Sequence, residues 1–464
     1  MKTSEVSAQC FAVRQGEATT RLDCQFHLPS HYLLEEKIRN SGFPVYQLGD
    51  EEITINIVDG PFGTQLKAEE YQESGIPVIR VSNCRTGEIR DDGELVFISE
   101  EKHQQLIRSE VLPGDVLVTK AGAILGYTAV FPKELVKGNI TSHLAAMRLT
   151  KNVIPQYLAW YLSSPAGIKQ IYRWGNKTTR PELNTEEVRK ILLPLPDTKI
   201  QNKLIAEMEI ARAKRQSMLA EADSLLAGID SFVLDELGLK LPKEERRNAF
   251  AARLKQLQAG QTMNPDYFHP ERTEAIKAIR KSSPRLRVER LADIADFIRE
   301  ITTIQEADKY LGLASVQSNT GELAQVEETA DGQCFRYKKN DVMFGRLRPY
   351  LNKIRCAEED GVCSTEFHII RVKEKDVSPE YLAVVLRSPL ILAQTKHMMT
   401  GNTHPRLTNE DVVNLVVPIP RDVDQQKKIV AELQRRRAQA RQLREEAERH
   451  WREAKEKFEK ALLG

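Results

Sequence analysis

The sequence predicts an α+β chain of two duplicated mixed α/β domains, each followed by a long helix, with the two helices forming an antiparallel coiled coil. Three observations predict this fold. Five blocks of the first half recur in the same order in the second half, at an offset near 225 residues. A proline-free stretch of about 40 residues with an apolar stripe follows each copy. Within each copy, short apolar runs alternate with Gly, Pro, Asn and Asp, as in strands joined by turns.

The duplication is the strongest of these observations. It aligns Asp115 with Asp341 and Tyr157 with Tyr381. Because the repeat is far longer than a solenoid unit, it indicates duplication of a whole domain with its following helix. The matched segments are 22–29 with 265–270, 114–126 with 340–353, 141–149 with 364–372, 154–165 with 377–389, and 175–208 with 401–433.

Within the first copy, the runs 94–98, 114–120 and 143–149 read as strands. Segments 155–164 and 185–192 read as helices, and Thr185 is a candidate cap for the second. In the two copies, His143 and His368 fall in apolar runs at what we take to be equivalent places. We therefore expect both to be satisfied core histidines.

Each copy ends in a Pro-x-Pro element, after which the apolar or small positions alternate at spacings of four and three, typical of a coiled coil. A helix of about 36 residues is roughly 54 Å long, so an antiparallel pair would hold the two domains at opposite ends. The stripes are Ile200, Leu204, Met208, Ala211, Met218, Ala222, Leu225, Ile229 and Phe232, and Ile429, Leu433, Arg436, Ala440, Leu443, Ala447, His450 and Ala454. The expected domains are 1–196, 197–238, 239–420 and 421–464.

Composition sets the remaining bounds. The chain has 464 residues, of which 41% are apolar and 29% charged, as in a folded protein of several domains. The formal net charge is only +2, so any basic surface must be local. The six cysteines form no CxxC pair, and we expect neither a metal site nor disulfides. We find no signal-peptide core and no apolar run of membrane-spanning length, and therefore expect a cytoplasmic protein.

Motifs for chemistry are missing from the sequence. It contains neither a GxxxxGK[ST] loop nor a GxGxxG turn after a strand. The nearest approach to the N-P-P-Y tetrapeptide of amino-methylating DNA enzymes is Asn264-Pro265-Asp266-Tyr267, which we interpret as a structural turn. We therefore expect no catalytic residues and no cofactor on this chain.

Two similar domains on paired helices could instead recognise two short patches a fixed distance apart. Arg, Lys, Asn and Gln supply the donors that contact base edges and phosphates. The first-copy candidates for DNA binding are Lys67, Arg80, Asn83, Arg85, Lys120, Asn176, Lys177 and Arg180. Those of the second copy are Gln317, Asn319, Arg346, Arg348, Lys353, Asn402, His404 and Arg406.

The ordinary interpretation of each candidate alone is a solvated surface charge. What favours a binding role is position, because basic glycine-bearing turns stand at the same place in both copies, at 120–122 and 345–348. The two turns differ in sequence. They would therefore read different bases.

These residues resemble a known family, the specificity subunits of type I restriction-modification enzymes, along nearly the whole chain. The segments that carry the resemblance are DGPFGT, GIPVIRVSN, PGDVLVTKAGAILG and LLPLPDTKIQNKLI, then YLGLASVQSNTGEL, NDVMFGRLRPYLNKI, STEFHIIRV and VPIPRDVDQQKKI. The Glu-Gln that usually follows the family's Pro-Leu-Pro-like hinge is here Ile200-Gln201 and Asp424-Gln425.

The resemblance implies two target recognition domains separated by an antiparallel coiled coil and bound to double-stranded DNA. It implies two modification subunits as partners, which methylate adenine with S-adenosylmethionine held on the methyltransferase. A restriction or translocase subunit is a further partner in some such systems. No membrane is involved.

Two other classes of protein stay open. One is a DNA methyltransferase or nuclease that carries its own recognition domains, which the missing motifs disfavour and which binding of S-adenosylmethionine to the isolated chain would reveal. The other is a coiled-coil scaffold that binds proteins, whose signature would be the lack of salt-dependent DNA affinity.

Overall fold

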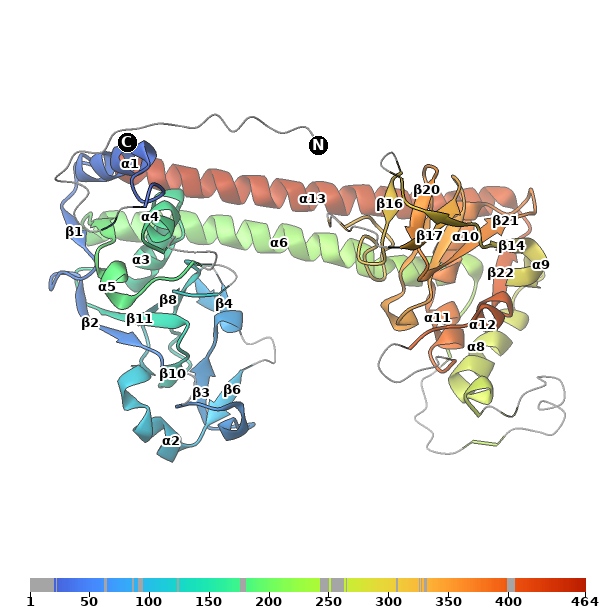
Figure 1. Ribbon diagram of the computed structural model, residues 1–464, viewed down its shortest axis with the longest axis horizontal. Helices are drawn as coiled ribbons and strands as arrows, with labels where there is room; N and C mark the ends of the chain where they lie inside the picture. The colour runs from blue at the N-terminus through green and yellow to red at the C-terminus, as the bar shows by residue number, and fades with distance from the viewer. Residues whose placement is uncertain are drawn as a thin grey trace. The chain divides into compact units, whose positions relative to one another are not determined.

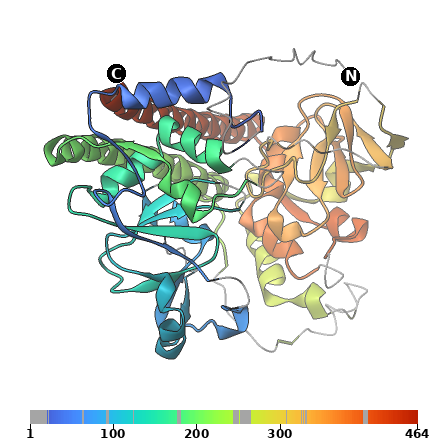
Figure 2. The same ribbon diagram turned by 60° about the vertical axis from the view of Figure 1, so that its left-hand side comes forward.

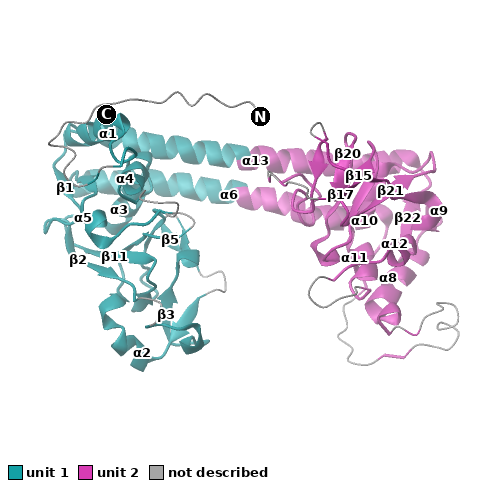
Figure 3. Cartoon of the chain, viewed as in Figure 1, with its two compact units in different colours: residues 1–218, 445–464 teal, residues 219–444 magenta. Residues whose placement is uncertain are grey.

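The computed structural model divides into two compact units, residues 1–218 with 445–464 and residues 219–444 (Figure 3). Each unit contains one sheet-rich domain and one half of each of two long helices, α6 (Thr198–Leu237) and α13 (Val423–Leu463). The described residues are 21, 23–61, 65–85, 87–90, 95–122, 125–175, 181–242, 250–251, 263, 265–305, 308–324, 326, 328, 332–398 and 405–464.

The domain of the first unit combines two four-stranded sheets with a two-stranded one (Figure 1). The sheet orders are β6-β3-β10-β7, β2-β11-β8-β9 and β1-β12, and a small hairpin pairs β4 with β5. Its strands are β1 (Val45–Gln47), β2 (Thr54–Asp59), β3 (Ile76–Ile79), β4 (Cys84–Arg85), β5 (Glu88–Ile89), β6 (Val96–Ile98), β7 (Glu110–Val111), β8 (Val116–Thr119), β9 (Thr128–Val130), β10 (Gly138–Ile140), β11 (Leu144–Leu149) and β12 (Leu192–Pro194). Its helices are α1 (Pro29–Arg39), α2 (Glu100–Gln105), α3 (Pro155–Leu162), α4 (Pro165–Gly175) and α5 (Thr185–Arg189), with short 3-10 turns η1 (Ala68–Glu70), η2 (Val81–Asn83) and η3 (Ile107–Ser109).

The domain of the second unit repeats this plan with the sheets β14-β21-β18-β19, β15-β17-β20-β16 and β13-β22. Its strands are β13 (Leu286–Arg290), β14 (Ala295–Ile298), β15 (Ile301–Thr303), β16 (Tyr310–Leu311), β17 (Gln333–Tyr337), β18 (Val342–Gly345), β19 (Ile354–Cys356), β20 (Gly361–Ser364), β21 (Phe367–Val372) and β22 (Val416–Pro420). Its helices are α8 (Pro270–Arg280), α9 (Leu291–Ile294), α10 (Pro379–Leu386), α11 (Pro389–Thr395) and α12 (Asn409–Val413), with the 3-10 turns η4 (Pro265–Phe268) and η5 (Pro349–Leu351).

Strand pairing confirms the duplication. In both units an all-antiparallel sheet has the same order, and the second sheet contains one parallel pair, β3 with β10 and β16 with β20. The second sheets differ at opposite edges, because β6 adds next to β3 in the first unit, whereas β15 adds next to β17, the strand equivalent to β7, in the second. The duplicated frame therefore carries different edge elements.

Buried polar contacts also repeat. Asp115 accepts a two-pronged hydrogen bond from Arg148, with an Nη2–Oδ2 distance of 2.9 Å, and Asp341 does the same with Arg371 at 2.7 Å. The Tyr157 hydroxyl donates to the Pro194 carbonyl, as the Tyr381 hydroxyl does to that of Pro418. The predicted alignment of both pairs, Asp115 with Asp341 and Tyr157 with Tyr381, is confirmed.

The two long helices run antiparallel within each unit. In the first, Glu207 pairs with Lys457 and Arg215 with Glu448, so residue numbers rise on α6 as they fall on α13. In the second unit, Asp223 pairs with Arg444 and Glu236 with Lys428. All residues of the two predicted stripes are buried or half-buried. None of the described helices combines the length and apolarity that crossing a bilayer requires.

The C-terminal half of α13 buries further side chains that its predicted stripe omits. Trp451 packs edge-on against Trp160 of α3, with ring centroids 5.6 Å apart, and Phe458 lies near Tyr157. Both belong to the core cluster that also contains Ile38 of α1. Figure 2 shows α1 beside this end of α13, as does Figure 1. The end of the chain is thus part of the first unit's core.

Two local predictions need correction. The cap of α5 is Asn184, which is extended and accepts from the Glu187 N–H, whereas Thr185 is already helical and donates its hydroxyl to Asp59. His143 is exposed, because it precedes β11 and is equivalent in the strand frame to Glu366. The prediction of a core histidine holds for His368 alone.

The hinge glutamines also need realignment. Gln201 accepts from the Ile154 N–H and donates to the carbonyls of Asn152 and Pro196. Gln426 makes the corresponding three bonds to Ser378, Asp376 and Pro420. The partner of Gln201 in the repeat is therefore Gln426, one residue beyond the Gln425 chosen from the sequence.

Candidate nucleic-acid interface

The basic turns that follow β8 and β18 are held by the same two backbone hydrogen bonds. We call this arrangement, centred on Lys120 in the first unit and on Arg346 in the second, the crossing. In the first unit, the Lys120 N–H donates to the His143 carbonyl and the Lys120 carbonyl accepts from the Leu183 N–H. In the second unit, Arg346 makes the same two bonds, to Glu366 and from Leu407. Each turn is thus fixed between the start of the central strand and the segment that leads to the short helix α5 or α12.

An acidic side chain orients the basic residue in the first unit. The Lys120 ammonium lies 2.7 Å from Asp59 Oδ1, and its side chain is only 12% exposed. Asp59 also accepts the Thr185 hydroxyl. Lys120 is therefore held in place and its charge is locally compensated.

The second unit has a comparable pair on the other side of the crossing. Arg406 binds Glu366 through both Nε and Nη2, at 3.0 and 2.7 Å, and this contact raises the pKa of Arg406. An isolated antiparallel bridge joins Leu347 to Arg406, and the Arg348 N–H donates to the Pro405 carbonyl. Arg346, Arg348 and Arg406 are thus brought together by the backbone.

Arg348 is the most available of these side chains. It is exposed and adopts a left-handed backbone conformation, with φ of 47°, just before η5. Arg346 is half-buried. Lys353 donates to the Leu313 carbonyl, and partial burial lowers its pKa. Its ammonium group is therefore engaged in a contact within the domain.

Gln317 and Asn319 lie in a separate turn of the second unit. Gln317 is half-buried, and its backbone N–H donates to the Glu322 carbonyl. Asn319 is exposed with φ of 62°, and its N–H donates to the Leu351 carbonyl, 3.3 Å away. That bond ties this turn to η5, next to Arg348.

The other candidates of the first unit differ in exposure. Lys67 is exposed beside η1, and Arg80 is half-buried before η2. Asn83 is 1% exposed, and its side-chain oxygen accepts from the Arg80 N–H. Arg85 donates to the carbonyls of Ser82 and Cys84. The side chains of Asn83 and Arg85 therefore stabilise the turn in which they lie.

Five candidates, Asn176, Lys177, Arg180, Asn402 and His404, lie outside the described residues. Sequence reasoning missed the two carboxylates, Asp59 and Glu366, that orient basic side chains at the crossings. The alignment of the two copies gave a partial indication of this role for Glu366, because it places Glu366 opposite His143 next to the basic turn.

One comparison with known proteins concerns part of the second half. Residues 287–448 match the family model described as the type I restriction modification DNA specificity domain. These residues include β14 to β22 and the first part of α13.

The chain is similar to specificity subunits of type I restriction enzymes of Escherichia coli. It is 28% identical to that of EcoBI over 162 residues, which are 34% of this chain and 33% of that protein. With the EcoKI subunit of strain K12 it shares 25% over 166 residues, 34% of this chain and 35% of the relative. With the EcoDI subunit it shares 21% over 276 residues, 57% and 59% of the two chains. The first two matches thus span about a third of each relative.

The fold of the whole chain has a counterpart among solved structures. A chain from a structure described as the basis of complex assembly and conformational transition of the type I R-M system covers 91% of this chain and 96% of its own length. The TM-score is 0.54 and the identity 15%. The likeness establishes a shared fold.

Proposed function

We propose that this chain is a non-catalytic DNA specificity subunit in which each sheet-rich domain reads one half of a bipartite target. The observation that carries the proposal is the duplicated crossing that presents Lys120 in one unit and Arg346 with Arg348 in the other. A fold that repeats while the basic residues of its turns differ suits two readers of different half-sites. The family model that matches residues 287–448 supports DNA as the ligand.

The described candidates divide by role under this proposal. Arg348 and Asn319 are exposed on backbone-fixed turns and suit contacts with base edges. Lys67, exposed and distant in sequence from the crossing, suits a phosphate contact. Lys120 and Arg406 reach DNA only by sharing or exchanging their carboxylate partners, Asp59 and Glu366.

We further propose that α6 and α13 pair as an antiparallel coiled coil that sets the spacing between the two readers. The ion pairs in each unit and the burial of both stripes support this pairing. Two modification subunits that hold S-adenosylmethionine would supply methylation in the cytoplasm. A restriction subunit would be a further partner.

The first test compares DNA binding by two charge-matched variants of the second unit. Arg348→Gln removes an exposed charge at the crossing, and Lys375→Gln removes one from an exposed turn elsewhere in the same unit. Cognate DNA is selected from a random double-stranded library and its affinity measured at fixed salt. Arg348→Gln should weaken binding by about ten- to a hundred-fold, since such a contact is worth ~1–3 kcal/mol. Lys375→Gln should stay within about two-fold of the parent chain, as expected for a charge away from the contact surface.

Equal losses in the two variants would mean that only net charge matters and would contradict a reader at this crossing. The rival classes give other results. Stoichiometric binding of S-adenosylmethionine by the isolated chain would favour an enzyme. DNA affinity that does not fall with added salt would contradict phosphate contacts.

A further inference from the structure

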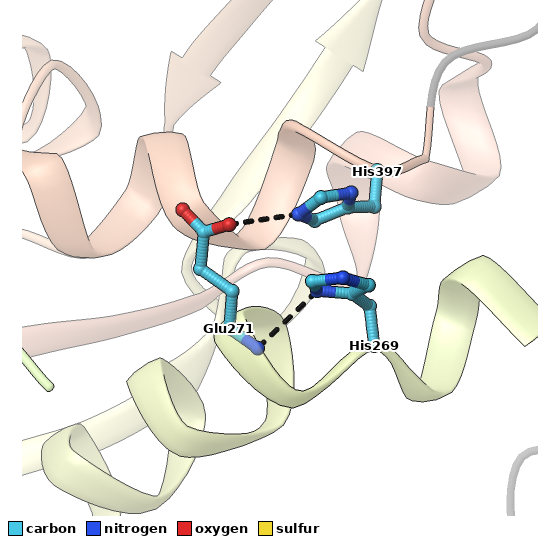
Figure 4. Close-up of side chains that lie close together, drawn as sticks. All are labelled: His269, Glu271 and His397. Carbon is cyan, nitrogen blue, oxygen red and sulfur yellow. Dashed lines mark hydrogen bonds and ion pairs between the residues drawn. The ribbon is translucent and has the colours of Figure 1, made fainter. Parts of the chain in front are cut away.

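Three metal-ligating side chains meet at one junction of the second unit (Figure 4). His269 caps α8, Glu271 lies in its first turn, and His397 follows α11. One potential ligand atom from each residue lies within 4.8 Å of those of the other two. All three are half-buried, and therefore open to solvent on one side.

The present contacts show which atoms face each other. His397 Nε2 lies 2.8 Å from Glu271 Oε2, and the backbone N–H of Glu271 donates to His269 Nδ1 over 3.3 Å. The two imidazole rings stack with centroids 3.5 Å apart. Lys396 contacts the other carboxylate oxygen, Oε1, at 3.1 Å. Oε2 is therefore the oxygen directed at the histidines.

The same junction in the first unit has a different chemistry. There Leu28 stands at the cap position of His269, and the preceding His27 has both ring nitrogens within hydrogen-bond distance of oxygens, those of the Tyr32 hydroxyl and the Arg21 carbonyl. Arg173, at the position of His397, pairs with Glu35 and stacks over Phe26. Arginine cannot bind a metal ion. The first unit therefore adopts the same fold without a pair of histidines at this place.

We propose that His269, Glu271 and His397 form a binding site for a divalent transition-metal ion of the zinc type. Two imidazole nitrogens and one carboxylate oxygen are a ligand set that Zn²⁺ prefers, with water in the fourth position. His269 would bind through Nδ1, whose lone pair already accepts a hydrogen bond. The ion would replace the proton between His397 Nε2 and Glu271 Oε2.

Metal binding requires the side chains to move. Tetrahedral Zn²⁺ with bonds of ~2.0–2.1 Å places its ligand atoms about 3.4 Å apart, whereas these atoms lie within 4.8 Å of one another. The two stacked rings would also turn out of their parallel arrangement, so that one nitrogen of each points at the ion. The bound ion would fasten α8 to the end of α11.

The experiment uses the full chain, free of any affinity tag and stripped with EDTA. His269→Asn keeps a helix-capping oxygen, and His397→Gln keeps a donor toward Glu271, so both variants retain the structural contacts while losing a ligand. His143→Gln, an exposed histidine of the first unit, is the matched control. Calorimetric titration with ZnCl₂ measures affinity and stoichiometry, and the absorption spectrum of the Co²⁺ form reports coordination.

We expect one Zn²⁺ per parent chain, a tetrahedral Co²⁺ spectrum, and at least ten-fold weaker binding in His269→Asn and His397→Gln with unchanged thermal stability in EDTA. His143→Gln should bind as the parent chain does. The proposal is overturned if the parent chain binds no zinc stoichiometrically. Equal zinc binding by the parent and both ligand variants would overturn it too, because these three side chains would then not hold the ion.

Discussion

Gln201 and Gln426 are fully buried at the start of the two long helices, and each satisfies one N–H and two carbonyls of the preceding domain. A buried amide that meets three backbone groups couples the orientation of the helix to that of the domain. Gln170 and Gln394 act similarly, each exchanging two hydrogen bonds with the backbone of Leu192 or Val416. Side-chain amides therefore join elements that strand pairing does not connect.

Replacing Gln201 by Ala should destabilise the first unit. The change removes the side-chain partner of three backbone groups, those of Asn152, Ile154 and Pro196, and the three lost hydrogen bonds together cost about 3 kcal/mol. For a unit of this size that loss lowers Tm by about 6–12 °C. Gln216→Ala, at an exposed position of the same helix, should change stability by less than about 0.5 kcal/mol. Calorimetry that finds the two variants equally stable would contradict the role of this amide.

His368 should make stability depend on pH in a defined window. Burial lowers its pKa to about 4, below its ordinary value of 6.5. Between these values the unfolded chain binds a proton that the folded chain does not, so the free energy of unfolding falls as pH decreases from 6.5. The contribution of one such group is at most about 1.4 kcal/mol per pH unit.

Urea unfolding at pH 7, 6 and 5 measures this dependence. His368→Gln keeps a donor toward the Leu407 carbonyl and should flatten the slope by the contribution of one proton. His143→Gln, at an exposed histidine of the first unit, is the matched control variant. A parent-like slope in His368→Gln would show that another group titrates in this window.

At the residue scale, sequence reasoning succeeded where one residue type has one physical role. The buried aspartates 115 and 341 were aligned correctly because both follow a turn and precede a central strand. It failed at Thr185 and His143, since the choice of cap and the depth of a histidine depend on backbone angles and strand ends that composition does not determine. The cluster around Glu271 was missed because His397 is 126 residues away.

At the scale of elements, periodicity predicted two long helices of about 36 residues, and α6 and α13 have 40 and 41 residues. The second buried stripe of α13, with Trp451 and Phe458, was not predicted. Its partners, Trp160 and Tyr157, come from a domain almost 300 residues earlier. A heptad pattern describes contacts between two helices and carries no information about a third partner.

Matched insertions in α6 and α13 test the proposed role of these helices as a spacer. Seven residues inserted after Met218 and after Arg444, where the two units divide, keep both stripes in phase and add about 10.5 Å. We expect a folded chain whose preferred target has a spacer longer by about three base pairs, at 3.4 Å each. The readout is sequencing of methylated molecules from a variable-spacer library.

Two-residue insertions at the same places are the control. They rotate each stripe by about 200° and should mainly destabilise the chain. If the variant with the seven-residue insertions folds but prefers the same spacer as the parent chain, the two helices do not set the spacing.

At the scale of the whole molecule, the duplication could be predicted because it is written in the sequence. The pairing order of the strands could not, since the strands are short and the parallel pairs β3 with β10 and β16 with β20 connect distant segments. The same limit applies to the candidate surface. The sequence located both basic turns, and only the structure revealed that Lys120 and Arg406 are paired with carboxylates.

Domain replacement tests the central claim, that the two domains read their half-sites independently, most directly. Residues 50–195 are exchanged for the equivalent domain of a relative, the chain is assembled with its modification subunits, and methylated molecules from a random library are sequenced. The account predicts that one half of the target changes while the other half remains as in the parent chain. A change in both halves, or in neither, would contradict it.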